Sequence, residues 1–378
     1  MVEPTPNWQT PCLLIDEARM KENIRRLKDR LARLRIPLRP HLKTSKNVEI
    51  AHLLMSAPGG PITVSTLKEA EVFSANGVTD ILYAVGIAPA KLDRALALRR
   101  RGTDISIVLD TCEQASFVVQ ALRREDENIS VLIEIDADGH RAGIEPLDPL
   151  LVKVARTLHD GGAELRGIMT HAGGSYDRPG EEALVSAAEQ ERAAGVLAAE
   201  ALKSANLPCP VVSVGSTPTA HFAKSLDGVT EVRAGVFVFF DLVMAGLGVC
   251  TIDDIALSVL ATVIGHQRKK GWILVDAGWT AMSRDRGTAR QHVDQGYGVV
   301  CDQGGRPYPD LIMTRANQEH GILSIREGSS AVCPDLPIGS LVRILPNHAC
   351  ATASQFGRYY LLDRHDTITG IWDRFSGW

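Results

Sequence analysis

One lysine has the residue type and the sequence context for covalent chemistry. Lys43 lies in a short basic segment, residues 39–46, which reads Arg-Pro-His-Leu-Lys-Thr-Ser-Lys. A lysine amine can form a Schiff base with an aldehyde cofactor, and it can also remove a proton as a general base. A solvated basic loop is the alternative for an isolated lysine, so the interpretation depends on its neighbours.

Small residues and hydroxyl groups form the second candidate group. Residues 215–219 read Gly-Ser-Thr-Pro-Thr, and residues 234–236 read Ala-Gly-Val. Backbone N–H groups and hydroxyls in such turns can close around an anion, which is the usual phosphate site of a parallel barrel. A plain glycine-rich turn is the alternative. Together, a lysine and a phosphate site are typical of an enzyme that binds a phosphorylated aldehyde.

His348 and Cys350 form a His-x-Cys pair that could bind a metal ion. If the pair lies in a strand, both side chains point to one face and can reach the same ion. A thiolate and an imidazole favour Zn²⁺, with Mn²⁺, Co²⁺ or Mg²⁺ as alternatives. Two protein ligands would leave positions open for water and substrate. A packed histidine beside a buried cysteine is the alternative without a metal.

The scaffold for these residues follows from two alternating periods between residues 15 and 245. Apolar residues 20, 24, 27, 31 and 34 step by three or four, which predicts a helix that Asp16 caps. Strands are expected at 36–42, 62–65, 81–85, 105–109, 131–135, 165–170, 211–214 and 231–233. Helices are expected at 68–76, 91–100, 113–124, 150–159 and 181–204. This pattern predicts a (β/α)8 barrel over 15–245, with a doubly wound open sheet as the alternative.

The carboxyl ends of barrel strands usually carry the chemistry. In this chain they carry His41 with Lys43, Asp136, Thr170 shortly before Tyr176, Gly215 to Thr219, and Ala234 with Gly235. The candidate lysine and the candidate phosphate site therefore fall at the same end of the predicted barrel.

The pattern changes after residue 245. Strands separated by Gly and Asp turns are expected at 256–265, 272–276, 341–345, 359–362 and 367–373. They predict a β-rich domain made of residues 1–14 and 246–378, which carries the metal pair. The net charge of −4 does not suggest a nucleic-acid or anionic-membrane surface. Seven scattered cysteines and no apolar stretch of membrane-spanning length indicate a cytoplasmic protein with free thiols.

Five segments together resemble the D-serine dehydratase / D-threonine aldolase family. They are residues 39–46, 138–143 (Asp-Gly-His-Arg-Ala-Gly), 215–219, 233–241 and 346–352 (Pro-Asn-His-Ala-Cys-Ala-Thr). The resemblance covers nearly the whole chain. It implies a fold-type III pyridoxal 5′-phosphate (PLP) enzyme with an alanine-racemase-like barrel, and a homodimer. Residues 62–71, 275–279, 283–290 and 316–321, with Gly377 and Trp378, are most similar to members that dehydrate D-threo-3-hydroxyaspartate.

The resemblance also implies roles for single residues. Lys43 would anchor PLP and act as the catalytic base, and a divalent metal would bind His348 and Cys350. Aldolase relatives tend to carry Asp where Cys350 stands. The other residues expected at the cofactor are His41, Arg141, Thr170, Tyr176, Gly215, Ser216, Thr217, Gly235 and Val236.

The expected reaction is loss of water from a 3-hydroxy D-amino acid, with 3-hydroxyaspartate giving oxaloacetate and ammonia. D-Serine dehydration, and aldol cleavage of D-threonine or of 3-hydroxy-D-aspartate, are the alternatives. We expect His320 at the substrate, although a solvated turn fits it nearly as well. A β-carboxylate would need a cation such as Arg284, Arg286 or Arg290.

Overall fold

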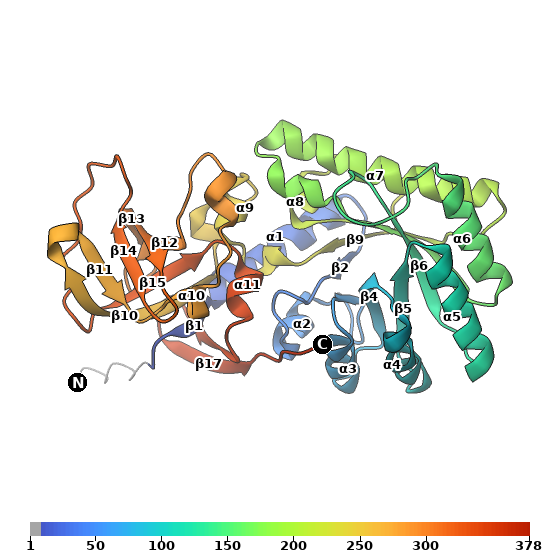
Figure 1. Ribbon diagram of the computed structural model, residues 1–378, viewed down its shortest axis with the longest axis horizontal. Helices are drawn as coiled ribbons and strands as arrows, with labels where there is room; N and C mark the ends of the chain where they lie inside the picture. The colour runs from blue at the N-terminus through green and yellow to red at the C-terminus, as the bar shows by residue number, and fades with distance from the viewer. Residues whose placement is uncertain (1–8) are drawn as a thin grey trace. The chain divides into compact units, whose positions relative to one another are not determined.

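The computed structural model describes residues 9–378, and the chain divides into two compact units (Figure 1). The first unit contains the chain up to Asn23 together with Val238–Phe375, and the second contains Ile24–Phe237 with Ser376–Trp378. Each unit is built on one sheet. Residues 1–8 of the predicted β-rich segment 1–14 lie outside the described residues.

The second unit is a closed barrel of eight parallel strands. The order in the sheet is β2-β9-β8-β7-β6-β5-β4-β3, and a bridge between His41 and Thr63 joins the two ends. The strands are β2 (Leu38–Pro40), β3 (Ile62–Val64), β4 (Asp80–Gly86), β5 (Asp104–Leu109), β6 (Ser130–Ile135), β7 (Glu164–Thr170), β8 (Val211–Val214) and β9 (Glu231–Ala234). Chain order around a closed sheet confirms the predicted (β/α)8 barrel and excludes the doubly wound sheet.

Helix α1 precedes the first barrel strand, the other helices follow barrel strands, and their sequences explain where several of them begin. The Asp16 carboxylate accepts the Arg19 N–H at 2.9 Å, as predicted for the cap of α1, and Thr111 forms a capping box with Gln114 at the start of α5. The helices are α1 (Glu17–Arg33), α2 (Val48–Leu54), α3 (Leu67–Ala75), α4 (Pro89–Arg100), α5 (Cys112–Glu125), α6 (Pro149–Asp160), α7 (Glu181–Ser204) and α8 (Thr217–Phe222). The short helices α2 and α8 were not predicted, because one or two turns give too little apolar periodicity.

The first unit is a nine-stranded, mostly antiparallel sheet in the order β11-β14-β13-β12-β15-β10-β1-β16-β17. Its strands are β1 (Cys12–Asp16), β10 (Leu257–Gln267), β11 (Trp272–Val275), β12 (Gly298–Cys301), β13 (Pro307–Ala316), β14 (Gly321–Ile325), β15 (Leu341–Pro346), β16 (Arg358–Leu362) and β17 (Ile368–Asp373). Its short helices are α9 (Leu242–Gly246), α10 (Trp279–Met282) and α11 (Ala349–Ala353). The predicted β-rich character is confirmed. Strands β12, β13 and β14 were not predicted, and in β13 the residues Pro307, Pro309 and Asp310 interrupt the strand pattern.

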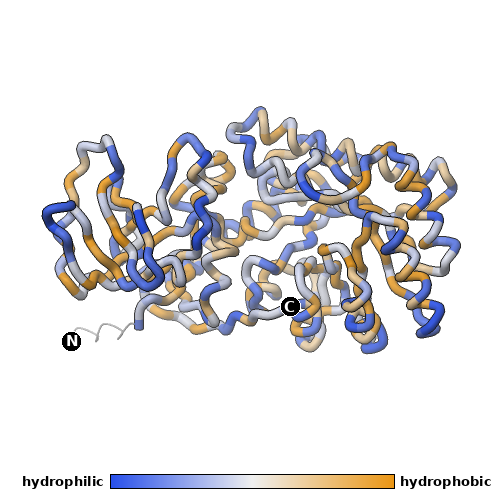
Figure 2. Tube along the Cα trace, viewed as in Figure 1, coloured by the Kyte–Doolittle hydropathy of each residue, from blue (hydrophilic) through white to orange (hydrophobic). Residues whose placement is uncertain are grey.

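Each unit has its own apolar core. Leu82, Val108, Leu132 and Met169 pack together from four neighbouring barrel strands, and Cys12, Leu14, Leu260 and Leu362 form a cluster in the other sheet. Figure 2 shows apolar residues along the strands and mixed polar and apolar residues along the helices.

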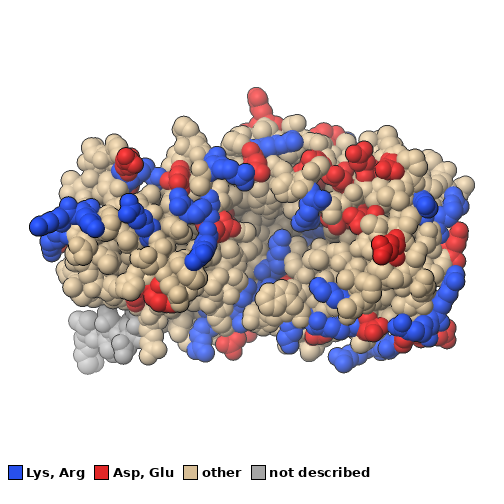
Figure 3. All heavy atoms as spheres, viewed as in Figure 1, with Lys and Arg blue, Asp and Glu red and all other residues tan. Residues whose placement is uncertain are grey.

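The charged groups of the visible face are mixed in sign. In Figure 3, Lys and Arg side chains lie among Asp and Glu side chains over the barrel unit. Among the residues that the structure describes, no helix has both the length and the apolar character that crossing a bilayer requires. The surface therefore shows no feature on this face that would single out a polyanionic partner.

Candidate active site

The segment that carries Lys43 is fixed at the carboxyl end of the barrel. The His41 N–H donates to Ala234 O at 2.8 Å, and the Leu42 N–H donates to Thr63 O at 2.9 Å. Lys43 itself follows in an exposed turn, where its N–H lies 3.5 Å from His41 Nδ1. The backbone is thus held between β9 and β3, while the amine remains accessible for chemistry.

His171 lies directly after β7 and connects two strand ends of the barrel. Its Nδ1 is 3.0 Å from Gly215 O, and its ring centroid lies 6.2 Å from that of Tyr176. Tyr176 belongs to η1 (Gly173–Asp177), the turn that follows β7. The predicted cofactor residue Tyr176 is therefore next to His171, which follows Thr170 at the end of a predicted strand.

Burial and positive charge keep His171 neutral. Burial, together with Lys43, Arg233 and Arg141, lowers the pKa of His171 to about 3, against the hydrogen bond to Gly215. These electrostatic couplings show that all three cations face one histidine at the barrel end. The site is consequently electropositive, as the site of a phosphorylated cofactor should be.

The two arginines at this end differ in their surroundings. Arg141 donates to Glu134 at 3.2 Å and keeps 59% of its side chain exposed. Arg233 is 3% exposed and donates to Ser213 Oγ and to Thr170 O, each at 2.6 Å. Arg141 can therefore turn toward a ligand at the cost of one solvated ion pair, whereas Arg233 is a fixed charge beneath the site.

The turn after β8 has the shape of an anion cradle. Gly215 has φ +134°, and a Cβ there would lie 2.2 Å from Arg233 O, so only glycine fits. Ser216 caps α8 and forms a capping box with Thr219. Among the described residues, the buried hydroxyl of Thr217 has no hydrogen-bond partner. A buried hydroxyl without a partner at a helix start fits an anion that supplies the missing acceptor.

Two further residues support the same fit. The Thr170 hydroxyl at the end of β7 is also buried and without a partner among the described residues. At Gly235, a Cβ would lie 2.9 Å from His41 O, so the turn before Val236 packs against the segment of Lys43. The residues present at the barrel end therefore fit a phosphorylated aldehyde with Lys43 as its amine.

The metal pair lies at a helix start in the first unit, so the strand geometry considered for it does not apply. Strand β15 ends at Pro346, His348 is the N-cap of α11, and Cys350 lies in the first turn of that helix. The chain turns at Asn347, whose amide donates to Gly296 O at 2.6 Å and whose Oδ1 accepts from Thr288 at 2.7 Å. The buried hydrogen bonds of the Asn347 side chain thus end β15 before the pair. Such long-range bonds leave no signal in the apolar pattern of the sequence.

His348 and Cys350 nevertheless lie together. The Cys350 side chain hydrogen-bonds to the His348 ring, and His348 Nδ1 lies 2.8 Å from Asp285 Oδ2. Burial alone would lower the pKa of His348, but Cys350, Asp285 and Asp241 raise this pKa to about 11. Nδ1 is thus held by a carboxylate, and Nε2 is the ring nitrogen that would bind a metal beside Cys350, an arrangement common behind zinc-binding histidines. The excess of negative groups around the ring fits a divalent cation.

One observation bears on the coordination of an ion at this pair. Among residues 9–378, no group of three or more His, Cys, Asp or Glu side chains is arranged to hold a metal ion. Any ion on His348 and Cys350 would therefore complete its coordination with water or substrate.

His320, the predicted substrate residue, lies exposed in the turn between β13 and β14, where His320 O accepts the Asn317 N–H at 2.8 Å. Its role stays a prediction.

The comparisons with known proteins cover both units. Residues 15–243 match the alanine racemase N-terminal domain, and residues 256–362 match the putative serine dehydratase domain. A D-threo-3-hydroxyaspartate dehydratase from Delftia sp. (strain HT23) is 56% identical over 98% of each chain. The chain belongs to the D-serine dehydratase / D-threonine aldolase family. This membership confirms the resemblance seen in the sequence.

Further comparisons agree with this family. A D-serine dehydratase from Dictyostelium discoideum is 30% identical over 98% of each chain. The solved structure of the Delftia enzyme has a TM-score of 0.95 and 56% identity, over 98% of this chain and 99% of that chain. A cysteine-to-alanine variant of a D-threo-3-hydroxyaspartate dehydratase is described in the metal-free form, with a TM-score of 0.95 and 55% identity over the same shares of the two chains. The chain is accordingly an enzyme, a PLP-dependent lyase of fold type III.

Sequence reasoning assigned no role to four residues that organise the site of this family member. Asp285 and Asp241 act on the metal pair, and His171 and Arg233 lie at the barrel end. Their positions carried weak signals. Arg233 and Asp241 are the first and last residues of segment 233–241, which resembles the family. His171 follows a predicted strand end, and Asp285 lies in segment 283–290, which also resembles family members. Their partners lie far away in the chain, so spacing alone did not assign them a role.

We expect the neutral state of His171 to make the folded state sensitive to acid. An ordinary histidine has a pKa of about 6.5, whereas burial holds His171 at about 3. Between these values the unfolded chain binds a proton that the folded chain does not. Stability is therefore full above about pH 6.5 and falls on acidification, by up to about 1.4 kcal/mol per pH unit. Urea unfolding at pH 7 and pH 5 should show a smaller loss for His171→Gln than for the wild type. Equal losses would contradict this assignment.

Proposed function

We propose that the protein is a PLP- and divalent-metal-dependent dehydratase that converts D-threo-3-hydroxyaspartate to oxaloacetate and ammonia. The observation that carries the proposal is the His348–Cys350 pair with Asp285 behind it, in a chain that also presents Lys43 at the barrel end. The cysteine in this pair supports a dehydratase over an aldolase. The 56% identity to a D-threo-3-hydroxyaspartate dehydratase supports the substrate.

Lys43 would perform the proton transfer at the α-carbon. PLP supplies, when bound, an electron sink for the negative charge that develops on this carbon. The Lys43 amine would hold the cofactor at rest and then accept the α-proton. Gly215, Ser216 and Thr217 would bind the phosphate, together with the turn of Gly235 and Val236. Arg141 would lie near the phenolic oxygen, and His41, Thr170 and Tyr176 would orient the ring.

His348 and Cys350 would hold the metal ion, and Asp285 would orient the imidazole. A bound divalent metal supplies Lewis acidity, which makes a β-hydroxyl a better leaving group. A thiolate and an imidazole favour Zn²⁺, and the metal-free form described for a cysteine-to-alanine variant of a similar enzyme supports a cysteine ligand. The homodimer and the cytoplasmic location expected from the sequence stay predictions.

Of the candidates Arg284 and Arg286, Arg284 suits a second carboxylate better. Arg286 already pairs with Asp294 at 2.7 Å and lies over Tyr297. Arg284 lies 4.1 Å over the Trp279 ring and has no ion-pair partner among the described residues. It also directly precedes Asp285, which contacts the metal pair. We therefore assign Arg284 to the β-carboxylate of 3-hydroxyaspartate.

A product assay tests the function. Purified protein is incubated with D-threo-3-hydroxyaspartate, D-serine and D-threonine, and oxo acid, ammonia and aldehyde are measured. We expect oxaloacetate and ammonia to form fastest from 3-hydroxyaspartate, whereas glycine plus an aldehyde would show an aldolase. Arg284→Gln should raise KM for 3-hydroxyaspartate about tenfold or more, the effect of losing one charged hydrogen bond, and leave KM for D-serine unchanged. Arg315→Gln is the matched control, because Arg315 also lies over a tryptophan, Trp272.

A further inference from the structure

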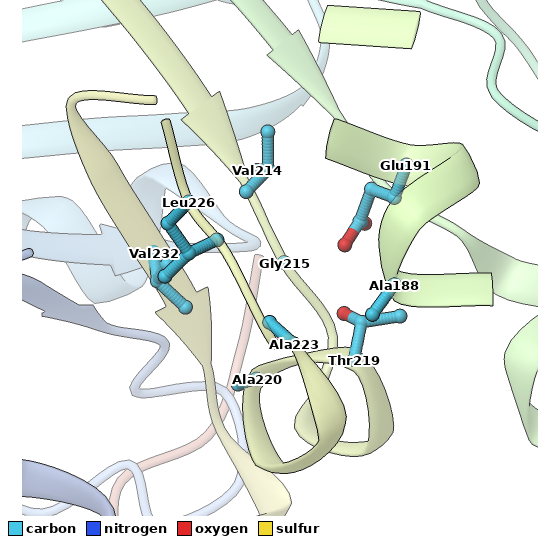
Figure 4. A pocket seen from close by; sticks show the side chains of 9 residues that line it. All are labelled: Ala188, Glu191, Val214, Gly215, Thr219, Ala220, Ala223, Leu226 and Val232. Atoms are coloured by element: carbon cyan, nitrogen blue, oxygen red, sulfur yellow. The ribbon is translucent and has the colours of Figure 1, made fainter. Parts of the chain in front are cut away.

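Helix α7 carries a glutamate whose carboxyl group is buried beside the anion cradle. Glu191 is 1% exposed, in contrast to Glu200, which lies exposed further along the same helix. In Figure 4 the Glu191 carboxyl points away from its own helix, toward the Gly215 turn and the side chain of Thr219. A buried carboxyl is costly unless hydrogen bonds satisfy it, so its partners reveal what it does.

The partners of Glu191 belong to two different strand–helix loops. Its Oε1 accepts the Ala172 N–H at 2.7 Å. Ala172 follows His171 in the loop after β7. The same carboxyl hydrogen-bonds to the Thr219 side chain and to the Gly215 backbone, both in the loop after β8. One side chain therefore joins the loop after β7 to the loop after β8.

A second link joins the same two loops. The Ser175 hydroxyl lies 3.1 Å from the Ser216 hydroxyl, and Ser175 also donates to Ala172 O at 2.7 Å. Ser216 in turn closes the capping box of α8 with Thr219. The capping box that begins the cradle helix is thus tied to the neighbouring loop by Ser175 and by Glu191.

The space around Glu191 offers no competing partner among the residues that line it. A small cavity beside the carboxyl is lined mainly by apolar side chains, with Glu191 and Thr219 as the polar ones (Figure 4). Its apolar walls include Ala188, Val214, Ala223, Leu226 and Val232. The carboxyl therefore hydrogen-bonds only to the two loops among the residues that line this space. Removing it would leave the Ala172 and Gly215 N–H groups without this acceptor.

We propose that Glu191 is a positioning residue of the cofactor phosphate site, which fixes the Gly215–Thr219 cradle against the loop of Ala172. This inference rests on the proposed function, in which Lys43 and the Gly215–Thr219 cradle hold PLP. Glu191 does not touch the phosphate; it holds the backbone and the capping box that do. Its loss should therefore weaken the recognition of phosphate and not the chemistry at Lys43.

The charge of Glu191 fits this role. Burial raises the pKa of Glu191, although Thr219, Ala172, Arg233 and Gly215 favour the ionised form. Arg233 is the cation that faces the carboxyl, from β9. A phosphate dianion nearby would favour the neutral acid still more, because like charges repel. Glutamine resembles the neutral acid in shape and polarity, so it should preserve the cradle.

The test compares two aldehydes that differ only in the phosphate. Full-length protein freed of cofactor is titrated with PLP and with pyridoxal, and binding is followed by visible absorbance. We expect Glu191→Leu to raise the Kd for PLP at least about tenfold, which corresponds to about 1.4 kcal/mol, with the Kd for pyridoxal unchanged. Glu191→Gln should restore most of the PLP affinity. Glu200→Gln, an exposed change on the same helix, is the matched control.

Each outcome decides one question. If Glu191→Leu does not fold, Glu191→Asp takes its place, because the shorter side chain withdraws the carboxyl from Ala172. Unchanged PLP affinity in a folded variant, or an equal loss of PLP and pyridoxal affinity, would overturn the positioning role. A wild-type protein that binds neither aldehyde would instead contradict the proposed function.

Discussion

Replacing Lys43 with alanine is expected to abolish the visible absorbance of the bound cofactor and to lower kcat/KM by at least about 10³-fold. Proton transfer by a positioned side chain contributes about 10² to 10⁴ in rate, and this lysine would also hold the cofactor covalently. Lys43 is the lysine named among the charged groups that lower the pKa of His171 at the barrel end. The spectrum and the release of oxo acid from D-threo-3-hydroxyaspartate provide the two measurements.

Lys43→Arg is the sharper version of this experiment. A guanidinium keeps the positive charge that acts on His171, but it is a poor nucleophile and remains protonated. The arginine variant should therefore fold and stay colourless like the alanine variant. If either variant kept the chromophore and turned over at the wild-type rate, Lys43 would be neither the anchor nor the base.

The barrel could be predicted from the sequence because its periods are regular. Strands such as β5 and β6 are short apolar runs buried on both faces, and helices such as α5 and α6 show one apolar face. Chain order around the sheet could not be derived from spacing. It required the pairing of β2 with β9 and the bridge from His41 to Thr63, which close the ring. The family resemblance had anticipated this closure.

Site residues could be predicted where the residue type itself indicates the chemistry. They could not be predicted where their role depends on contacts with residues far away in the chain. Lys43 and the Gly215 turn could be identified because both fall at strand ends of the predicted barrel and within segments that resemble the family. Glu191 looked like any polar residue of a long helix, and its burial depends on loops after β7 and β8. The start of α11 was missed for the same reason, because buried bonds of Asn347 to other segments end β15.

Metal removal is expected to lower the rate of water elimination by at least about 10²-fold, with full recovery when Zn²⁺ is returned. Lewis-acid stabilisation of a leaving oxygen is worth several kcal/mol, and about 2.7 kcal/mol corresponds to this factor. The holoenzyme is treated with a chelator, its metal content is measured, and activity is followed on D-threo-3-hydroxyaspartate and D-serine. Both substrates should lose activity together, because each must expel a β-hydroxyl.

Variants test whether the metal that supports activity binds His348 and Cys350. Cys350→Ala should bind no metal and should not recover with Zn²⁺, whereas Cys333→Ala, at a half-buried free cysteine of the same unit, should behave like wild type. Asp285→Asn weakens the acceptor of His348 Nδ1, so about 10- to 100-fold more Zn²⁺ should be needed for recovery. Full activity in protein stripped of metal, or unchanged metal content in Cys350→Ala, would remove the metal from this pair. A loss in Cys350→Ala that Zn²⁺ reverses would make Cys350 a supporting residue, and His348 would then have to bind the ion with other ligands.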